Sequence, residues 1–273
     1  MTYQRIQDGK DTFWFDPVFF DEVTAAHFSA AYWQAQHAVE GSSRGRNVAW
    51  FVRHQQHAMV LRHYYRGGLI GKILGDQFLW QAEQHSRAMQ EFTLLQWMVG
   101  QGLPVPKPCA ARYQRRGLYY CADLIIERIP ASQDVATVLQ RQPLSAAQWQ
   151  AVGQAIARLH QAGVYHSDLN CHNILIDQDD KIWLIDFDKC ERRAAGRWQI
   201  ENLARLRRSL RKEWQKAALP ASSADAESTQ APMYFHWQES NWLALLAGYQ
   251  QQCPSVILPA ELTQLPTQVS ASS

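Results

Sequence analysis

The stretch that decides the fold runs His166-Ser-Asp168-Leu-Asn-Cys-His-Asn173-Ile-Leu-Ile176 and is followed by Trp183-Leu-Ile-Asp186-Phe-Asp188. A polar loop leads into a short apolar run, and a second apolar run leads into another polar segment. Short apolar runs bounded by turn residues are typical of buried strands. The pattern therefore predicts a loop, a strand, a turn and a strand, with Asp168 and Asn173 in the loop and Asp186 at the end of the second strand.

The order and spacing of these residues match the catalytic pattern of kinases. Phosphoryl transfer needs a carboxylate that orients the acceptor hydroxyl and takes its proton, together with metal ligands that neutralise charge on the triphosphate. Asp168 suits the first task, while Asn173 and Asp186 carry the oxygen ligands that Mg²⁺ prefers. His166 is expected to brace the loop. The sequence thus predicts an ATP- and Mg²⁺-dependent kinase with Asp168 as its catalytic residue.

Upstream segments supply weaker parts of the same pattern. Residues 37–40, 48–53 and 58–64 predict three antiparallel strands, residues 119–129 predict another strand, and the apolar spacing from Ser86 to Gly100 predicts a helix. Arg62 stands on the third strand, where kinases keep a Lys that contacts the phosphates; Arg keeps the charge but differs in geometry. Glu91, on the helix, is its expected partner. The alternative is a surface ion pair worth under about 1 kcal/mol.

A glycine-containing turn joins the first two of these strands. It consists of Gly41, Ser42, Ser43, Arg44 and Gly45, and such a turn is weak evidence when taken alone. Its position is where backbone N–H groups would cover the phosphates of a nucleotide. Residues 41–75 also hold six basic and no acidic residues, which favours a polyanion; a solvated basic face is the alternative.

Composition narrows the class of protein. Hydrophobic residues make up 47% and charged residues 19% of the 273 residues, which is typical of a globular chain. A net charge of +2 is too small to indicate a nucleic-acid binder. The five cysteines are widely spaced without a C-x-x-C pair, which favours a reducing compartment. The polar N-terminus and the absence of an apolar run near ~20 residues predict a cytoplasmic protein.

The expected fold class is α+β, a bilobed protein-kinase-like fold. An antiparallel-sheet, nucleotide-binding lobe with an N-terminal extension would span residues 1–129, and a mainly helical catalytic lobe would span residues 130–273, with a linker at Pro130. No long activation segment or A-P-E motif follows Asp188, so a peptide platform is not indicated. A small molecule or a lipid head group is the expected acceptor.

A basic segment follows closely on Asp188. Residues 192–216 contain nine basic and two acidic residues. Within it, an apolar stripe and a cationic stripe recur at helical spacing, namely Leu203, Leu206, Leu210 and Trp214 beside Arg205, Arg208, Lys212 and Lys216, with Arg207 and Arg211 adding charge. Core packing is the favoured interpretation of the apolar stripe. We expect Arg205, Arg208 and Lys212 to bind anionic groups of the acceptor or an anionic membrane surface, although a solvated face remains the alternative.

Several runs resemble those of the 3-deoxy-D-manno-octulosonic acid (Kdo) kinases, in the lipopolysaccharide kinase group of the protein-kinase-like superfamily. The resemblance extends from about residue 44 to residue 214. Its most specific runs are Asp168-Leu-Asn-Cys-His-Asn-Ile-Leu175, Ile185-Asp-Phe-Asp-Lys-Cys190 and Asn202-Leu-Ala-Arg-Leu-Arg-Arg-Ser-Leu210.

The resemblance implies a bilobed kinase with Asp168 in its active site. It also implies transfer of the ATP γ-phosphate to the 4-hydroxyl of Kdo in Kdo-lipid IVA, by a peripheral protein at the cytoplasmic face of the bacterial inner membrane. The residues alone leave two alternative functions open. One is an aminoglycoside- or choline-type phosphotransferase, for which an acidic acceptor pocket is expected. The other is a pseudokinase that binds nucleotide or anionic lipid without catalysis, against which the intact Asp168, Asn173 and Asp186 argue.

Overall fold

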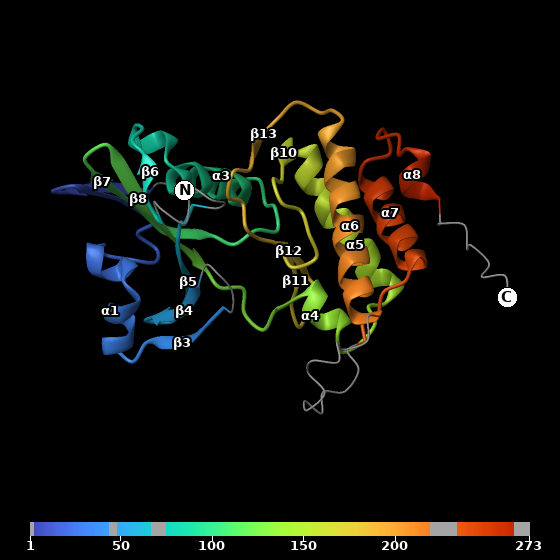
Figure 1. Cartoon of the computed structure of the whole chain (residues 1–273), viewed down its shortest axis with the longest axis horizontal. Coiled ribbons are helices and arrows are strands. Elements are labelled where there is room, and N and C mark those ends of the chain that lie inside the picture. The colour runs from blue at the N-terminus through green and yellow to red at the C-terminus, as the bar shows by residue number, and fades with distance from the viewer. Residues whose placement is uncertain (1–2, 44–47, 67–74, 219–233, 265–273) are drawn as a thin grey trace. The chain divides into compact units, whose positions relative to one another are not determined.

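The computed structural model describes residues 3–43, 48–66, 75–218 and 234–264. The chain divides into two compact units, Met1–Pro130 with Phe187–Cys190, and Ala131–Asp186 with Glu191–Ser273. The first unit is built on an antiparallel sheet and the second mainly on helices (Figure 1). The α+β class predicted from the sequence is confirmed.

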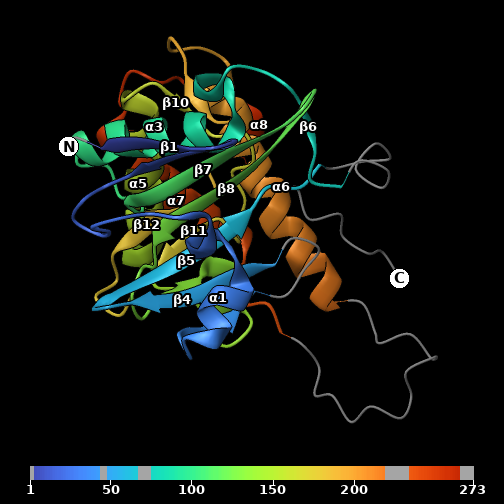
Figure 2. The ribbon, with the colours of Figure 1, turned by 90° about the vertical axis from the view of Figure 1, so that its left-hand side faces the viewer.

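The sheet of the first unit has the strand order β1-β2-β7-β8-β5-β4-β3, with β6 also paired to β8. Neighbouring strands are antiparallel, and β7, β8, β5 and β4 lie side by side in Figure 2. The strands are β1 (Gln4–Asp8), β2 (Asp11–Phe15), β3 (Val39–Ser42), β4 (Ala49–His54), β5 (His57–His63), β6 (Phe78–Leu79), β7 (Pro108–Arg116) and β8 (Tyr119–Glu127). The predicted strands correspond to β3, β4, β5 and β8, whereas β1, β2, β6 and β7 were not predicted.

The first forty residues complete the core of this unit. All five residues of β2 are buried, and Phe13 and Phe15 pack in one cluster with Met59 and Ile125 of the sheet. Two short helices, η1 (Ala25–Phe28) and α1 (Ala30–Ala35), follow β2, and α1 adds the buried Trp33 to the cluster. Each such side chain contributes about 1.5–3 kcal/mol on burial, so this segment belongs to the folding unit.

Helix α3 (Arg87–Gly100) confirms the helix predicted from Ser86 onward. The Ser86 hydroxyl accepts a hydrogen bond from the backbone N–H of Met89 and so caps the first turn. A second short helix, η2 (Glu83–His85), leads into this cap. The helix packs against β7 and β8, and its buried face includes Glu91 and Phe92. The burial of a carboxylate on an otherwise apolar face requires compensating donors.

A cluster of charged groups joins β5, β7 and β8. His63 Nδ1 lies 2.6 Å from Asp123 Oδ1, and His63 Nε2 lies 3.1 Å from Asp76 Oδ2. Arg112 Nε donates to the other oxygen of Asp123 at 2.7 Å. Burial lowers the pKa of His63, but Asp123 and Asp76 outweigh that effect and raise it above the ordinary 6.5. The imidazolium form of His63 is thereby favoured in the folded protein.

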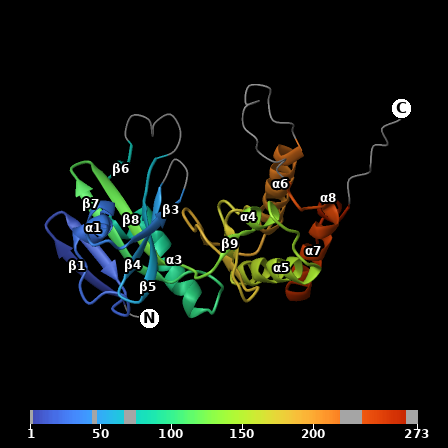
Figure 3. The ribbon, with the colours of Figure 1, turned by 90° about the horizontal axis from the view of Figure 1, so that it is seen from below.

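Two long helices pack closely in the second unit, α5 (Ala146–Gln161) and α7 (Glu239–Gln252) (Figure 3). They approach at glycines, because a Cβ on Gly153 would lie 1.9 Å from the carbonyl oxygen of Leu245, and one on Gly248 would lie 2.1 Å from that of Gln150. The other elements are β9 (Gln133–Asp134), α4 (Val135–Leu139), β10 (Val164–Tyr165), β11 (Ile174–Ile176), β12 (Ile182–Leu184), β13 (Glu191–Arg192), α6 (Trp198–Ala218) and α8 (Ala260–Thr263).

Candidate active site

The loop between β10 and β11 carries Asp168, whose side chain is 54% exposed. Asp168 Oδ1 accepts a hydrogen bond from Arg205 Nη1 of α6 at 2.9 Å. The backbone carbonyl of Asp168 accepts hydrogen bonds from the side-chain amides of Asn173 and Asn170, at 2.9 and 3.1 Å. These bonds close the loop over five residues, so that an accessible carboxylate stands on a restrained backbone.

His166 holds the base of this loop. It is fully buried, its Nδ1 accepts from the backbone N–H of Asp168 at 3.2 Å, and its Nε2 lies 3.0 Å from the carbonyl oxygen of Ile185. Asn202 of α6 bonds both the backbone N–H and the carbonyl of His166. Burial lowers the pKa of His166, and a neutral ring protonated at Nε2 satisfies both contacts. The predicted bracing role of His166 is confirmed by these contacts.

Asn173 and Asp186 lie at the same end of the β11–β12 hairpin. Ile174 of β11 pairs with Leu184 of β12, and the backbone N–H of Ile185 donates to the carbonyl of Asn173 at 3.0 Å. Asn173 precedes this pair directly, and Asp186 follows it at a left-handed φ of 66°. The Asn173 amide nitrogen donates to the Asp168 carbonyl, so the ligand atoms that the two side chains would offer a metal ion are the Asn173 amide oxygen and the Asp186 carboxylate oxygens. Such a set fits Mg²⁺, which proteins commonly hold through one or two side chains.

Arg62 and Glu91 form the ion pair that the sequence predicts. Arg62 Nη2 lies 2.6 Å from Glu91 Oε2, and the side chains are 20% and 1% exposed. The hydroxyl of Tyr64 also donates to Glu91 Oε2, at 2.5 Å. Burial and the neighbouring Glu91 raise the pKa of Tyr64 well above its ordinary value, so its hydroxyl stays protonated. The carboxylate of Glu91 thus receives the compensating donors that its burial requires.

The predicted phosphate-covering turn is described only in part. Gly41 and Ser42 end β3, and Ser43 makes two hydrogen bonds to Ala49 of β4. The backbone N–H of Ser43 donates to the Ala49 carbonyl at 2.8 Å, and the Ser43 hydroxyl accepts from the Ala49 N–H, also at 2.8 Å. Arg44 and Gly45 lie outside the described residues. The described part is the base of the turn, where the side chain of Ser43 joins the two strands.

Helix α6 presents the predicted cationic stripe. Arg205, Arg208 and Lys212 are exposed, whereas Leu203, Leu206 and Leu210 are buried, as core packing of the apolar stripe requires. Trp214 departs from the prediction, because it lies one turn beyond Leu210 and is 47% exposed.

Two other cations of α6 have a structural place that sequence reasoning missed. Arg207 is 4% exposed and pairs with Glu239 of α7 at 2.8 Å, and Arg211 pairs with the other oxygen of Glu239. The guanidinium of Arg207 also donates to the carbonyls of Glu261 and Leu262, at 2.6 and 3.2 Å. These contacts fasten α6 to α7 and α8, so Arg207 and Arg211 are engaged inside the unit.

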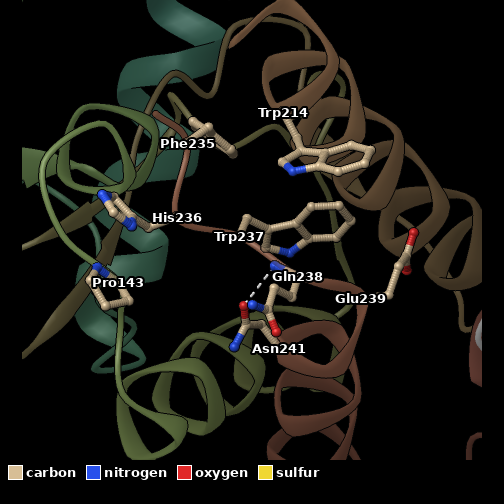
Figure 4. A pocket seen from close by; sticks show the side chains of 8 residues that line it. All are labelled: Pro143, Trp214, Phe235, His236, Trp237, Gln238, Glu239 and Asn241. Carbon is tan, nitrogen blue, oxygen red and sulfur yellow. Dashed lines mark hydrogen bonds between the residues drawn. The ribbon is translucent and has the colours of Figure 1, made fainter. Parts of the chain in front are cut away.

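A pocket of about 720 Å³ lies in the second unit, between the end of α6 and the start of α7 (Figure 4). The Trp214 and Trp237 rings meet edge to face there, with their centroids 6.5 Å apart. The backbone N–H of Gln238 donates to Asn241 Oδ1 at 2.8 Å and caps α7. The candidate residues named above do not line this pocket, so it is distinct from the candidate active site.

Within the part of the chain that the structure describes, the helices are too short or too polar to cross a membrane.

The sequence is similar to that of known lipopolysaccharide kinases. The sequence model of the Lipopolysaccharide kinase (Kdo/WaaP) family matches residues 30–249. A 3-deoxy-D-manno-octulosonic acid kinase of Vibrio parahaemolyticus is 42% identical over 242 residues, which cover 89% of this chain and 95% of the relative. Relatives with the same name occur in Vibrio vulnificus, 42% identical over 91% of this chain and 99% of the relative, and in Mannheimia succiniciproducens, 42% identical over 85% and 94%.

The protein is a kinase, that is, a phosphotransferase, as the catalytic pattern predicts.

Among solved structures, a co-crystal structure of WbdD with the kinase inhibitor LY294002 is 14% identical to this chain. The TM-score is 0.44, and the match covers 84% of this chain and 48% of that chain. The family's sequence model matches well over half of the chain, and the relatives are more than 30% identical across most of it. The chain belongs to the lipopolysaccharide kinase (Kdo/WaaP) family.

Proposed function

We propose that this kinase transfers the γ-phosphoryl group of ATP to the 4-hydroxyl of the Kdo residue of Kdo-lipid IVA, during lipopolysaccharide synthesis. The names of relatives that are 42% identical over about nine-tenths of the chain support Kdo as the phosphorylated sugar. The specific hydroxyl and lipid rest on the resemblance to Kdo kinases. A peripheral position at the cytoplasmic face of the inner membrane, on anionic lipid, follows from such an acceptor.

Asp168 is the catalytic base in this proposal, and the geometry of its loop is the observation that carries it. The carboxylate is 54% exposed, and Arg205 Nη1 occupies Oδ1, so Oδ2 is the oxygen that accepts a hydrogen bond from the sugar hydroxyl. That hydrogen bond orients the hydroxyl oxygen toward the γ-phosphorus, and Asp168 Oδ2 takes the hydroxyl proton as the new P–O bond forms. The bond to the leaving ADP oxygen breaks in the same transfer.

Asn173 and Asp186 would hold the metal ion through their side-chain oxygens. A bound Mg²⁺ neutralises charge on the triphosphate. The amide nitrogen of Asn173 donates to the carbonyl of Asp168. The same side chain therefore restrains the loop that carries Asp168 and supplies one of the proposed ligand atoms. A change of Asn173 is therefore expected to affect both nucleotide binding and the position of the base, whereas a change of Asp186 is expected to affect nucleotide binding.

Arg62 would contact the nucleotide phosphates while Glu91 holds its guanidinium. An Arg held by a buried carboxylate has fewer orientations open to it, which lowers the entropy lost on binding. The backbone of Gly41, Ser42 and Ser43 belongs to the turn assigned to the phosphates, together with Arg44 and Gly45.

The cationic stripe of α6 suits an anionic acceptor. Arg205, Arg208 and Lys212 are exposed and span about 10 Å of helix at ~1.5 Å per residue. Kdo carries a carboxylate and lipid IVA carries phosphates, so cations spaced along a helix can pair with both. An aminoglycoside or choline acceptor is cationic and would be repelled by the same stripe.

Transfer to a panel of acceptors tests this proposal. Kdo-lipid IVA, lipid IVA without Kdo, free Kdo, an aminoglycoside and choline are each incubated with ATP, and the release of ADP and the labelled product are measured. We expect transfer to Kdo-lipid IVA, no transfer to lipid IVA without Kdo, and a product phosphorylated at the 4-hydroxyl by NMR. Faster transfer to the aminoglycoside or to choline, or phosphate on another position, would contradict it.

A further inference from the structure

A bidentate ion pair joins the first turn of α3 to the segment that follows Asp186. Arg87 Nε donates to Asp188 Oδ1 at 2.8 Å, and Arg87 Nη2 donates to Asp188 Oδ2. The two side chains are 19% and 21% exposed, and residues Phe187–Cys190 belong to the same compact unit as α3. A planar guanidinium that meets both oxygens of a carboxylate fixes orientation as well as distance.

The rest of the Arg87 guanidinium is also held. Its Nη1 donates to the carbonyl of Tyr65 at 3.3 Å, and its central carbon lies 5.3 Å from the Tyr64 ring centroid and 5.1 Å from that of Phe78. These are cation–π distances. Arg87 is thus a fixed donor, and its position does not depend on Asp188 alone.

The same contacts continue to the ion pair assigned to the nucleotide. The Tyr64 ring also lies beneath Arg62, at 5.3 Å, and its hydroxyl donates to Glu91, which is four residues after Arg87 on α3. A continuous set of contacts therefore runs from Arg62 through Glu91, Tyr64 and Arg87 to Asp188; we call it the Arg87 network.

The turn at the end of the Arg87 network has an unfavourable backbone. Asp186 and Lys189 adopt φ values of 66° and 59°, in the left-handed region that non-glycine residues seldom occupy. The backbone N–H of Cys190 donates to the carbonyl of Phe187 at 3.0 Å and closes the turn. Such conformations persist where the surrounding structure determines them, and Asp188, which Arg87 holds, lies between the two left-handed residues in the sequence.

We propose that Arg87 is a positioning residue, which sets the orientation of the Asp186 carboxylate by holding the turn at residues 186–189 through Asp188. The inference rests on the proposed function, because it assigns Asp186 to the metal–nucleotide complex. Loss of the ion pair relaxes the turn and misplaces that carboxylate. The effect reaches nucleotide binding and transfer, while Arg87 and Asp188 need not touch either substrate.

A double-mutant cycle on the full chain tests the proposal. Arg87→Met, Asp188→Asn and the double variant are compared for binding of ATP with and without Mg²⁺, with no acceptor present, and for thermal unfolding. We expect each single variant to weaken binding of Mg²⁺-ATP by about 10- to 100-fold, the range for groups that orient a ligand, and the double variant to be no weaker than the worse single one. Binding of ATP without Mg²⁺ should change less than about twofold.

A second pair of variants and a control keep the outcome clear. Arg87→Lys retains the charge but cannot form a bidentate pair, and Asp188→Glu retains the carboxylate but moves it by one methylene. Both variants should fold and still lower kcat with little change in the acceptor KM. The matched control is the exposed pair Arg197 and Glu201, which are 90% and 61% exposed. The cycle of Arg197→Met and Glu201→Gln should leave every readout unchanged.

Three results would overturn the inference. Weak Mg²⁺-ATP binding in Asp188→Asn with normal binding in Arg87→Met would make Asp188 a direct metal ligand. A lowered melting temperature with normal Mg²⁺-ATP binding in the folded protein would make the pair merely structural, and additive effects would mean that the residues act separately. Failure of wild-type protein to phosphorylate Kdo-lipid IVA would refute the proposed acceptor, while a coupled binding cycle would still support the positioning role.

Discussion

Replacement of Glu91 by Gln should weaken the first unit in a way that the structure allows to be estimated. The side chain of Glu91 is 1% exposed and accepts from Arg62 at 2.6 Å and from Tyr64 at 2.5 Å. Gln has nearly the same shape, so the change removes the charge and replaces one acceptor oxygen by a donor amide. No cavity is created.

The expected loss follows from those two hydrogen bonds. A hydrogen bond to a charged group contributes about 1.5–3 kcal/mol and a neutral one about 0.5–1.5 kcal/mol, so each loses about 1 kcal/mol. Arg62 also loses its counter-ion, and since it is 20% exposed, water compensates for part of that cost. The free energy of unfolding of the first unit should fall by about 2–3 kcal/mol.

Native-state hydrogen exchange at the α3 amides measures this loss locally. Glu201→Gln is the matched control, because Glu201 is 61% exposed beside Arg197, and its effect should stay under about 0.5 kcal/mol. A loss of stability below about 0.5 kcal/mol in Glu91→Gln by exchange would show that its two hydrogen bonds do not stabilise the unit.

In turnover, Arg62→Ala and Glu91→Gln should each reduce kcat/KM for ATP, and the double variant should be little worse than the worse single one. Strict additivity in turnover would show that Arg62 and Glu91 do not act as a pair.

Three further predictions concern packing, pH and charge. Gly153→Ala places a Cβ 1.9 Å from the α7 backbone and should lower the melting temperature severely or prevent folding, whereas Gly100→Ala, with nothing within 4 Å, should leave it unchanged; equal melting of the two would contradict the glycine contact. The raised folded pKa of His63 contributes stability that is complete below the unfolded value of 6.5 and is lost as the pH rises through the folded value. The stability lost in His63→Gln should therefore be largest at pH 5–6 and should shrink as the pH rises. A difference in melting temperature between wild-type protein and His63→Gln that stays constant with pH would show that His63 does not titrate in this way. Arg208→Glu with Lys212→Glu should raise the acceptor KM and weaken binding to anionic liposomes at low salt, with both effects fading as salt is added and ATP binding unchanged; unaltered KM and liposome binding would leave this stripe as a solvated face.

Much of the candidate site could be predicted because its residues are close in sequence. Asp168, Asn173 and Asp186 stand in a fixed order around two short apolar strands, and those strands pair as β11 and β12. The pairing of Arg62 with Glu91 could also be predicted, since a strand followed by a helix offers few other partners. Local spacing carries this information directly.

The contacts that sequence reasoning missed join residues far apart in the chain. Arg87 and Asp188 are 101 positions apart, and Arg207 and Glu239 are 32 apart. Helical spacing shows that a cation lies on a face, but it does not show which later carboxylate that face will meet. The helical pattern therefore adds Arg207 and Arg211 to the charge of α6 without indicating that both are ion-paired with Glu239.

The missed strands have a different cause. β2 is buried along its whole length, so its sequence, Asp-Thr-Phe-Trp-Phe, lacks the alternation that marks a strand with one exposed face. β7 begins at Pro108, the last residue of a proline-rich run, and prolines favour assignment to a loop. Both strands owe their pairing to neighbours in the sheet, which the local sequence does not reveal.

The role proposed for Asp168 is to activate a sugar hydroxyl for attack on ATP. A single-turnover comparison of wild-type protein with Asp168→Asn tests this role most directly. Labelled ATP is bound first, Kdo-lipid IVA is added, and the rate of label transfer is measured beside the affinity for ATP. We expect transfer by Asp168→Asn to fall by about 10²- to 10⁴-fold, the range for loss of a general base, with ATP affinity nearly unchanged. Transfer by Asp168→Asn within about threefold of the wild-type rate would contradict it.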